Sequence, residues 1–349
     1  MATRFESPIS FVTRSSSPTT PSSGYGLVYS SGSNLFYEDD TATEYLLTRA
    51  GTRIVKQYTG STFWIKPVGI AEIFVACLGA GGGGGSGEIR GAGLDTSGGG
   101  AGGGGALNIR RLSAAQLTAT SYSISIGAGG AGALAQTTDS TFGITGSAGT
   151  DTTFAISGST VLVRAKAGTA GKGGVNGSSG FPSPGGSSQT GIPVGCWYSW
   201  DGDSGFPSDA TGQAVSGSSV YLCNGGGPGG PIAINLRRAG APGAALTITG
   251  SIFAANNGGS VSSPNATTNT SRIRTDFLFN FGFSDNLQYG IGFAGGGGAA
   301  GSGSFNGGSG SAAAPYSGGG GGGGAARNGF DSGPGGRGGD GLVTIIEYY

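Results

Sequence analysis

Short runs of alternating apolar and polar residues recur along the chain, and many of them end in glycine. The clearest is residues 70–78, IAEIFVACL, which stops at a tract of nearly pure glycine. Its length and its β-branched and aromatic residues predict a β-strand, and apolar residues on both faces predict burial on both sides. Residues 62–66 form a second extended run, and residues 67–69, Pro-Val-Gly, suit a tight turn. The pattern predicts a hairpin of these two strands.

Similar alternation predicts further strands downstream. Residues 153–156 and 161–165 flank Ser157-Gly158-Ser159 and predict a hairpin. Residues 274–283 carry phenylalanine at every second position from Phe277, which predicts an aromatic face in the core rather than an exposed binding ridge. The other predicted strands are residues 121–126, 246–249 and 287–293, the last paired with 274–283.

The first 60 residues differ from the rest, because they contain few glycines and several prolines. A polar connector at 15–23 precedes three short runs that predict a β-meander, at residues 25–29, 35–37 and 44–47. Such a meander is too small to bury its own apolar face, which predicts contact with partner copies. We therefore expect residues 1–60 to form an N-terminal module with a linker, and 61–349 to form a glycine-rich β domain.

Composition changes the picture, because 80 of the 349 residues are glycine, far above the usual level of about 7%. The strict G-X-Y period of collagen is absent, and 17 phenylalanines, 12 tyrosines and alternating strands argue against disorder. The predicted fold is all-β, with a small N-terminal β module followed by a β-sandwich-like glycine-rich domain.

The glycine tracts leave two alternatives open. They could be loops between strands, or they could be extended left-handed segments that lie side by side as polyglycine II and exchange backbone hydrogen bonds. The tracts that would suffice for a small bundle are residues 79–87, 98–105, 225–230, 295–303 and 318–324.

The sequence offers little chemistry for catalysis. It contains no histidine, so the most usual general base and metal ligand are missing. Gly79, Gly81 and Gly84 match G-x-G-x-x-G, but a nucleotide site needs a helix next, and a glycine-dominated stretch disfavours one by about 1 kcal/mol per residue. We predict no catalytic, metal or cofactor site. Carboxylate pairs leave a polysaccharide depolymerase as a minor alternative, and Asp201-Gly202-Asp203 lacks the other ligands of a calcium loop.

Charge and cysteine content limit the classes of partner and the cellular location that the sequence predicts. Lys plus Arg equals Asp plus Glu, at 18 each, so nothing favours nucleic acid or an anionic membrane. No apolar stretch is long enough for membrane insertion, and the first residues lack the apolar core of a signal peptide, which predicts assembly in a cytoplasm or release by lysis. Cys77, Cys196 and Cys223 are predicted to be buried free thiols, with a pairing of the last two left to test.

Residues 177–231 depart from the surrounding pattern and are expected to form an elaborated loop or insertion. Loops on a rigid scaffold are where recognition residues concentrate, and flat aromatic rings with N–H and O–H groups suit sugars. Packing of the insertion is the equal alternative. The candidate receptor-binding residues are Trp197, Tyr198, Trp200, Phe206 and Tyr221.

Several landmarks together resemble bacteriophage proteins. Residues 63–69 with the glycines at 79–85, then 122–132, and finally 338–349, are similar in kind and order to the glycine-rich domain of phage tail fibre and virion surface proteins. The run from Pro18 to Tyr37, with its prolines, Gly-Tyr-Gly and Leu-Phe-Tyr, looks like the N-terminal modules of phage fibre proteins.

The resemblance implies a non-enzymatic protein of the virion. The N-terminal module would dock to other virion proteins, and the glycine-rich domain would form a homotrimeric fibre tip that recognises a host surface glycan or protein. The second hypothesis is a head fibre or capsid decoration without essential receptor binding. A third, an ice-binding bundle, would need regular tripeptide repeats, which are not seen in the sequence.

Overall fold

The computed structural model of the chain describes its glycine-rich part most fully. The residues described are 27–31, 34–38, 44–46, 53–158, 160–175, 198–200, 226–227, 229–230, 232–233, 236–237, 240, 246–248, 251–253, 273–277, 287–291, 295, 297–298, 300–301, 305–313, 316 and 318–349. They contain strands and extended segments and no helix, which confirms the predicted all-β class.

The strands, in chain order, are β1 (Leu27–Ser31), β2 (Asn34–Glu38), β3 (Glu44–Leu46), β4 (Arg53–Tyr58), β5 (Thr62–Ile65), β6 (Glu72–Leu78), β7 (Ile89–Arg90), β8 (Leu107–Ser113), β9 (Ser121–Ser125), β10 (Thr152–Ile156), β11 (Val161–Ala165), β12 (Tyr198–Trp200), β13 (Ile232–Ala233), β14 (Leu236–Arg237), β15 (Leu246–Ile248), β16 (Ser251–Phe253), β17 (Ile273–Phe277), β18 (Leu287–Ile291), β19 (Ala326–Arg327) and β20 (Leu342–Tyr348).

Several predicted strands and pairings are confirmed. β1, β2 and β3 form the expected antiparallel meander, β10 pairs with β11 around Gly158, and β17 pairs with β18. Gly158 has a φ of 77°, a conformation that glycine adopts without a steric penalty. Phe279, Phe281 and Phe283 of the predicted aromatic face lie outside the described residues.

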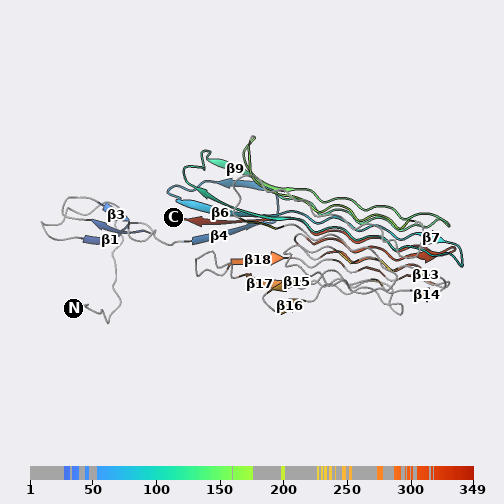
Figure 1. Cartoon of the computed structure of the whole chain (residues 1–349). Coiled ribbons are helices and arrows are strands. Elements are labelled where there is room, and N and C mark those ends of the chain that lie inside the picture. The colour runs from blue at the N-terminus through green and yellow to red at the C-terminus, as the bar shows by residue number, and fades with distance from the viewer. Residues whose placement is uncertain are drawn as a thin grey trace.

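Two antiparallel sheets pack face to face as a β-sandwich at one end of the structure (Figure 1). One has the strand order β12-β8-β6-β20-β4 and the other β11-β10-β9-β5. Trp64, Tyr122 and Phe154 fill the space between the sheets, with the rings of Tyr122 and Phe154 stacked at 5.2 Å. A second apolar cluster that includes Phe74 and Leu107 lies on the other face of the larger sheet.

The predicted hairpin of residues 62–66 with 70–78 is wrong. β6 lies between β8 and β20 in the larger sheet, whereas β5 pairs with β9 in the smaller one. The turn at Gly69, with a φ of 74°, instead carries the chain from one sheet to the other. Because β6 is apolar on both faces, it lies in the middle of its sheet, where β8 and β20 pair with its two edges and leave none for β5.

Glu347 is a buried carboxylate between the two sheets. Trp64 of β5 donates its indole N–H to Oε1 at 2.6 Å, Lys56 of β4 donates to the same oxygen at 2.6 Å, and Tyr349 donates its hydroxyl to Oε2 at 3.0 Å. Because a buried charge is costly unless it is paired, these donors tie the last strand to both sheets. Burial, and then the charge of Glu347, raise the pKa of Tyr58.

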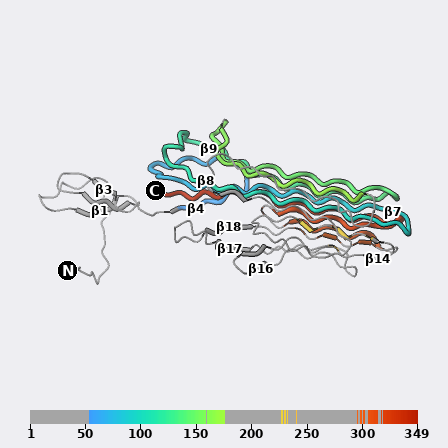
Figure 2. The backbone as a smooth tube through the Cα atoms, in the orientation of Figure 1, coloured from blue at the N-terminus to red at the C-terminus, as the bar shows by residue number. Residues whose placement is uncertain are grey.

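Beyond the sandwich, the glycine-rich segments lie side by side as a long lattice (Figure 2). Each segment bonds to its neighbours through backbone N–H and C=O groups spaced three residues apart, which is the period of a polyglycine II helix. Among the described residues ten segments take part, in four rows: 141–151 and 165–175; 127–136, 79–88 and 96–106; 331–341, 318–326 and 226–232; and 305–313 and 295–301.

Segment 79–88 has six neighbours. Its donors run in three series at 2.8–3.2 Å: Gly79, Gly82, Gly85 and Glu88 to segment 96–106; Gly81, Gly84 and Gly87 to segment 331–341; and Gly83 and Ser86 to segment 141–151, a series that Ile89 of β7 continues. Its carbonyls accept from segments 165–175, 127–136 and 318–326. Segment 318–326 is likewise surrounded by six segments. These two segments are the centre of the lattice.

Glycine is required wherever a side chain would point at a neighbouring segment. A Cβ on Gly84 would lie 2.0 Å from the carbonyl oxygen of Gly321, far inside van der Waals contact. Every glycine of segment 79–88 would direct a Cβ at the backbone of a neighbouring segment, so the sequence there is almost continuous glycine. An outer segment needs glycine only where it faces inward, as at Gly143, Gly146 and Gly149 of segment 141–151.

The polyglycine II alternative is therefore confirmed, and the statement that regular tripeptide repeats are not seen in the sequence is corrected. All five predicted tracts contribute described residues to the lattice. The other segments, 127–136, 141–151, 165–175, 305–313 and 331–341, were not predicted. Glycine recurs in them at three-residue spacing, diluted by the other residues that face outward.

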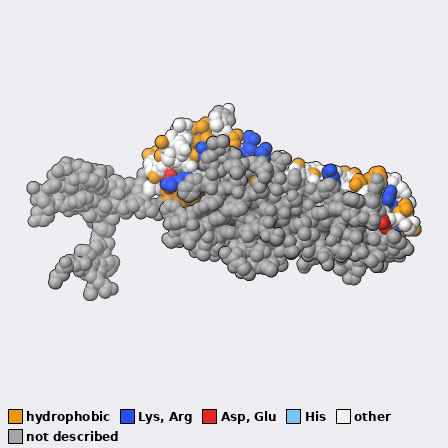
Figure 3. All heavy atoms as spheres, in the orientation of Figure 1, with side chains coloured by type: hydrophobic (Ala, Val, Ile, Leu, Met, Phe, Trp, Pro, Cys, Tyr) orange, Lys and Arg blue, Asp and Glu red, His pale blue; other side chains and the backbone are white. Residues whose placement is uncertain are grey.

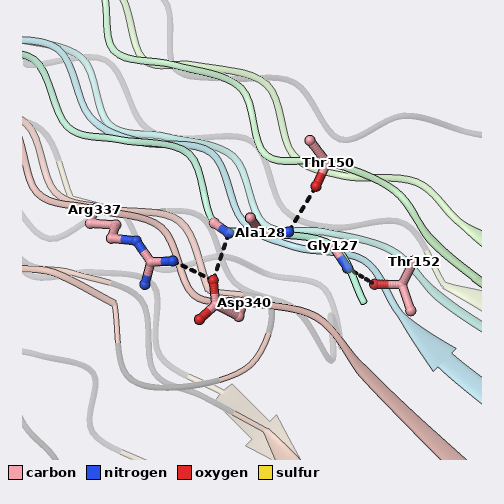
Figure 4. Close-up of polar contacts among 7 residues, drawn as sticks. Gly127, Ala128, Thr150, Thr152, Arg337 and Asp340 are labelled. Carbon is pink, nitrogen blue, oxygen red and sulfur yellow. Dashed lines mark hydrogen bonds and ion pairs between the residues drawn. The ribbon is translucent and has the colours of Figure 1, made fainter. Parts of the chain in front are cut away.

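The change from strand to lattice requires special hydrogen bonds (Figure 4). Where β9 ends, the consecutive backbone amides of residues 127–129 donate to side-chain oxygens: the first to Thr152 at 3.0 Å, the second to Thr150 at 2.7 Å and the third to Asp340 at 2.8 Å. Arg337 in turn bonds to Asp340. These oxygens satisfy amides that have left the sheet ladder, since buried backbone donors need a partner.

The lattice makes a direct prediction about glycine substitution. Gly84→Ala should lower the free energy of unfolding by at least about 2 kcal/mol, because the added methyl group meets backbone that cannot move aside. Gly60→Ala is the matched control, since nothing lies within 4 Å of its added Cβ. Chemical denaturation of both variants measures the difference. Equal stability of the two variants would contradict the lattice packing.

The Tyr58 environment predicts alkaline destabilisation. A tyrosine whose pKa is higher in the folded than in the unfolded state contributes stability that is complete below its ordinary pKa of 10.0 and is lost as pH rises further. The unfolding free energy of the native protein should therefore fall more steeply above pH 10 than that of Tyr58→Phe. Denaturation at pH 8 to 11 tests this, and identical pH profiles would refute it.

Candidate functional site

The loops of the lattice gather at its far end, which we call the tip. Segment 79–88 leaves β6 and segment 96–106 returns to β8, so loop 89–95 between them lies away from the sandwich. By the same connectivity, loops 137–140 and 327–330 lie at the tip. Figure 1 shows β7 there and the C-terminus at the opposite, sandwich end.

A short parallel pair of strands forms the base of the tip. β7 pairs with β19, and backbone bonds extend the pairing on both sides, from Ala326 N–H to Glu88 C=O at 3.0 Å and from Asn328 N–H to Arg90 C=O at 2.9 Å. β7 continues one central segment of the lattice and β19 continues the other. Loops 89–95 and 327–330 therefore rest on the two segments with most neighbours.

The side chain of Arg327 in β19 bonds to the backbone of loop 89–95. This side chain is buried, with 8% exposed, and its Nη1 donates to the carbonyl of Gly91 at 2.8 Å and to that of Leu94. Burial lowers the pKa of the Arg327 guanidinium, and the charge of Asp95 opposes this. The ordinary value is so high that the group remains a cation at neutral pH.

Loop 137–140 is bound to loop 327–330. Asp139 accepts the Gly329 N–H at 2.7 Å, and the Asn328 side chain accepts the Ser140 N–H at 3.1 Å. Ser140 has a φ of 57°, a left-handed conformation that is uncommon for a residue other than glycine, asparagine or aspartate. The loop is thus held in one conformation by its neighbour rather than by its own preference.

The outer surface near the tip presents mostly apolar and uncharged polar side chains, with basic and acidic groups among them, as the right-hand end of the coloured surface in Figure 3 shows. Leu94 in loop 89–95 is 51% exposed, and Leu134 on segment 127–136 is 78% exposed. Phe142, Ile144 and Val175 on the first row are also exposed. A surface of this kind is suited to contact with another molecule.

Within the described residues, no group of three or more histidine, cysteine, aspartate or glutamate side chains could hold a metal ion. A separate finding concerns membranes: the part of the chain that is described includes no helix with the length and apolar character to cross a bilayer.

Two of the five predicted receptor-binding residues lie within the described part of the chain. Tyr198 and Trp200 belong to β12, which pairs with β8 at the edge of the larger sheet, so part of segment 177–231 joins the sandwich ladder. Trp197, Phe206 and Tyr221 lie outside the described residues. The prediction for these residues therefore stays a prediction.

Sequence reasoning missed the tip. Asn328-Gly329 is a dipeptide typical of tight turns and could have located loop 327–330. Nothing local distinguishes Arg327 from the chain's other basic residues. Cys77 is a buried free thiol, as predicted, whereas Cys196 and Cys223 lie outside the described residues.

Fold and tip together define an all-β protein in which a β-sandwich continues into a polyglycine lattice with loops at its far end. The chain belongs to the glycine-rich domain family, whose sequence profile matches residues 56–349. A comparison with curated proteins found no match.

The loop contacts predict local rather than global effects. Asp139→Ala removes the acceptor of the Gly329 amide, so hydrogen exchange in 137–140 and 327–330 should become about fivefold faster, a loss of about 1 kcal/mol. The unfolding midpoint should not change, because the lattice is untouched. Thr137→Ala in the same loop is the control. Unchanged exchange in the Asp139 variant would show that the two loops are independent.

Proposed function

We propose that the protein is a non-enzymatic component of a phage virion surface, a fibre or spike whose lattice tip recognises the host cell. The observation that carries this proposal is the placement of loops 89–95, 137–140 and 327–330 on a rigid lattice, at the end away from the sandwich. Recognition residues are commonly found on loops that a rigid scaffold positions. The resemblance of the sequence landmarks to phage fibre proteins supports the same conclusion.

The remaining parts of the proposal follow from the chain's organisation. The β1–β3 meander attaches the protein to other virion proteins, and the protein acts as a homotrimer. A meander of this size needs partner surface to be stable, which supports both statements. The receptor is a glycan or a protein of the host surface, contacted by the tip, and the aromatic residues of segment 177–231 are a second candidate contact.

Binding to host cells tests the proposal. The purified full chain should bind saturably, with soluble surface glycan or receptor as competitor, and should have the mass of a trimer in solution. Val68→Ser, at a 92% exposed residue of the sandwich-end turn, is the control for surface substitution. Absence of binding by the folded protein, with loss of particle stability when the gene is deleted, would instead indicate capsid decoration.

A second variant separates the two contact regions. Combined replacement of Trp197, Tyr198 and Trp200 by alanine should abolish binding if segment 177–231 contacts the receptor. Full binding by this variant would place the contact in the tip loops. Buried aromatic contacts commonly supply most of the energy of an interface, so a partial contribution would still be measurable.

A further inference from the structure

The turn within loop 89–95 is bonded by one side chain from another loop, that of Arg327. The bond within its turn, from Leu94 N–H to Gly91 C=O, is long at 3.4 Å, beyond the usual range for such bonds. Gly93 between them has a φ of 78°, a conformation open to glycine but rarely to other residues. The same two carbonyls that bracket the turn, of Gly91 and Leu94, are the acceptors of Arg327.

The arginine side chain is not needed to hold the lattice together. The pairing of β7 with β19 is made by backbone groups, and Thr96 closes the loop by exchanging two backbone bonds with Ile232, at 2.9 and 3.0 Å. Within the described part of the chain, the side-chain hydrogen bonds of Arg327 go to loop 89–95. A charge-assisted bond is about twice as strong as a neutral one, which suits the task of fixing an exposed turn.

What the turn presents is an apolar side chain. Leu94 is 51% exposed, while its own carbonyl is bound by Arg327. The bond to that carbonyl restrains the backbone from which the leucine projects. An aliphatic group offers no hydrogen bond to a sugar, so it matches an apolar patch on a protein better than a glycan.

We infer that Arg327 is a positioning residue that presents Leu94 to an apolar patch on a host surface protein. This inference rests on the proposed function and narrows its receptor to the protein class. A pre-formed loop binds more tightly than a mobile one because less conformational entropy is lost on binding. Arg327 then contributes to affinity without touching the receptor.

The test combines loop dynamics with cell binding in the full chain. Arg327→Met keeps an apolar stem but removes every donor, and Leu94→Ser removes the contact. The controls are Arg111→Met, which breaks an ion pair with Glu72 on the sandwich, and Val68→Ser at an exposed apolar residue of the sandwich-end turn. Hydrogen exchange is read in loop 89–95, and binding is measured on untreated, protease-treated and periodate-treated cells.

We expect faster exchange in loop 89–95 of Arg327→Met, and binding at least about fivefold weaker in both tip variants but not in the controls. The double variant should bind no more weakly than Leu94→Ser alone, because the arginine acts through the leucine. Protease treatment should abolish binding and periodate should not; the reverse would overturn the assignment to a protein receptor.

Other outcomes separate this inference from the proposed function. If Leu94→Ser binds cells as tightly as the native protein does, the inference is overturned. Because Leu94 is exposed, this variant decides the question even if Arg327→Met does not fold. Unchanged exchange in a folded Arg327→Met also overturns it. If the native protein binds no host cell, the proposed function fails, while the exchange data still decide whether Arg327 fixes the loop.

Discussion

The structure depends on hydrogen bonds between backbones that carry no side chains. In segment 79–88 the amides point in three directions in turn, and each direction meets a different neighbour. A buried chain of this kind gains little from side-chain packing and loses more backbone entropy than any other. Its stability therefore depends on complete satisfaction of its polar groups, since an unpaired buried amide or carbonyl costs about as much as a lost hydrogen bond. The hexagonal packing follows from that requirement.

The sandwich sets the register in which the glycine segments of the lattice begin. Polyglycine segments have no pattern that would specify their register, whereas the strands do, because one face of each must be buried. β6, β9 and β11 each run directly into a lattice segment, and segments 96–106, 141–151 and 331–341 run back into strands. The register set in the sheets is thereby passed to the glycine segments, and Thr150, Thr152 and Asp340 cover the amides at the point of change.

How much of the structure could be predicted from the sequence depended on whether a feature is set by a local pattern or by contacts between distant segments. Period-two strands such as β9 and the continuous glycine of segment 79–88 were predictable, because each is a local pattern. The partner of β5 was not, because it is chosen by burial of Trp64 between sheets formed from distant segments. The outer lattice segments were missed because their glycines are diluted by outward-facing residues. Arg327 could not be found at all, since its two acceptors lie more than two hundred residues away in the chain.

The direction of the lattice bonds has a mechanical consequence. They run across the long axis, so a pull between tip and sandwich stretches no single bond in its own direction. It instead tries to slide whole segments past one another, and each central segment is held by rows of bonds to six neighbours that must break together. When antiparallel strands are peeled apart from one end, their hydrogen bonds break one at a time. When this bundle is pulled along its length, the hydrogen bonds of a segment are loaded together. The tip can thus carry tension while its loops remain free to differ in sequence.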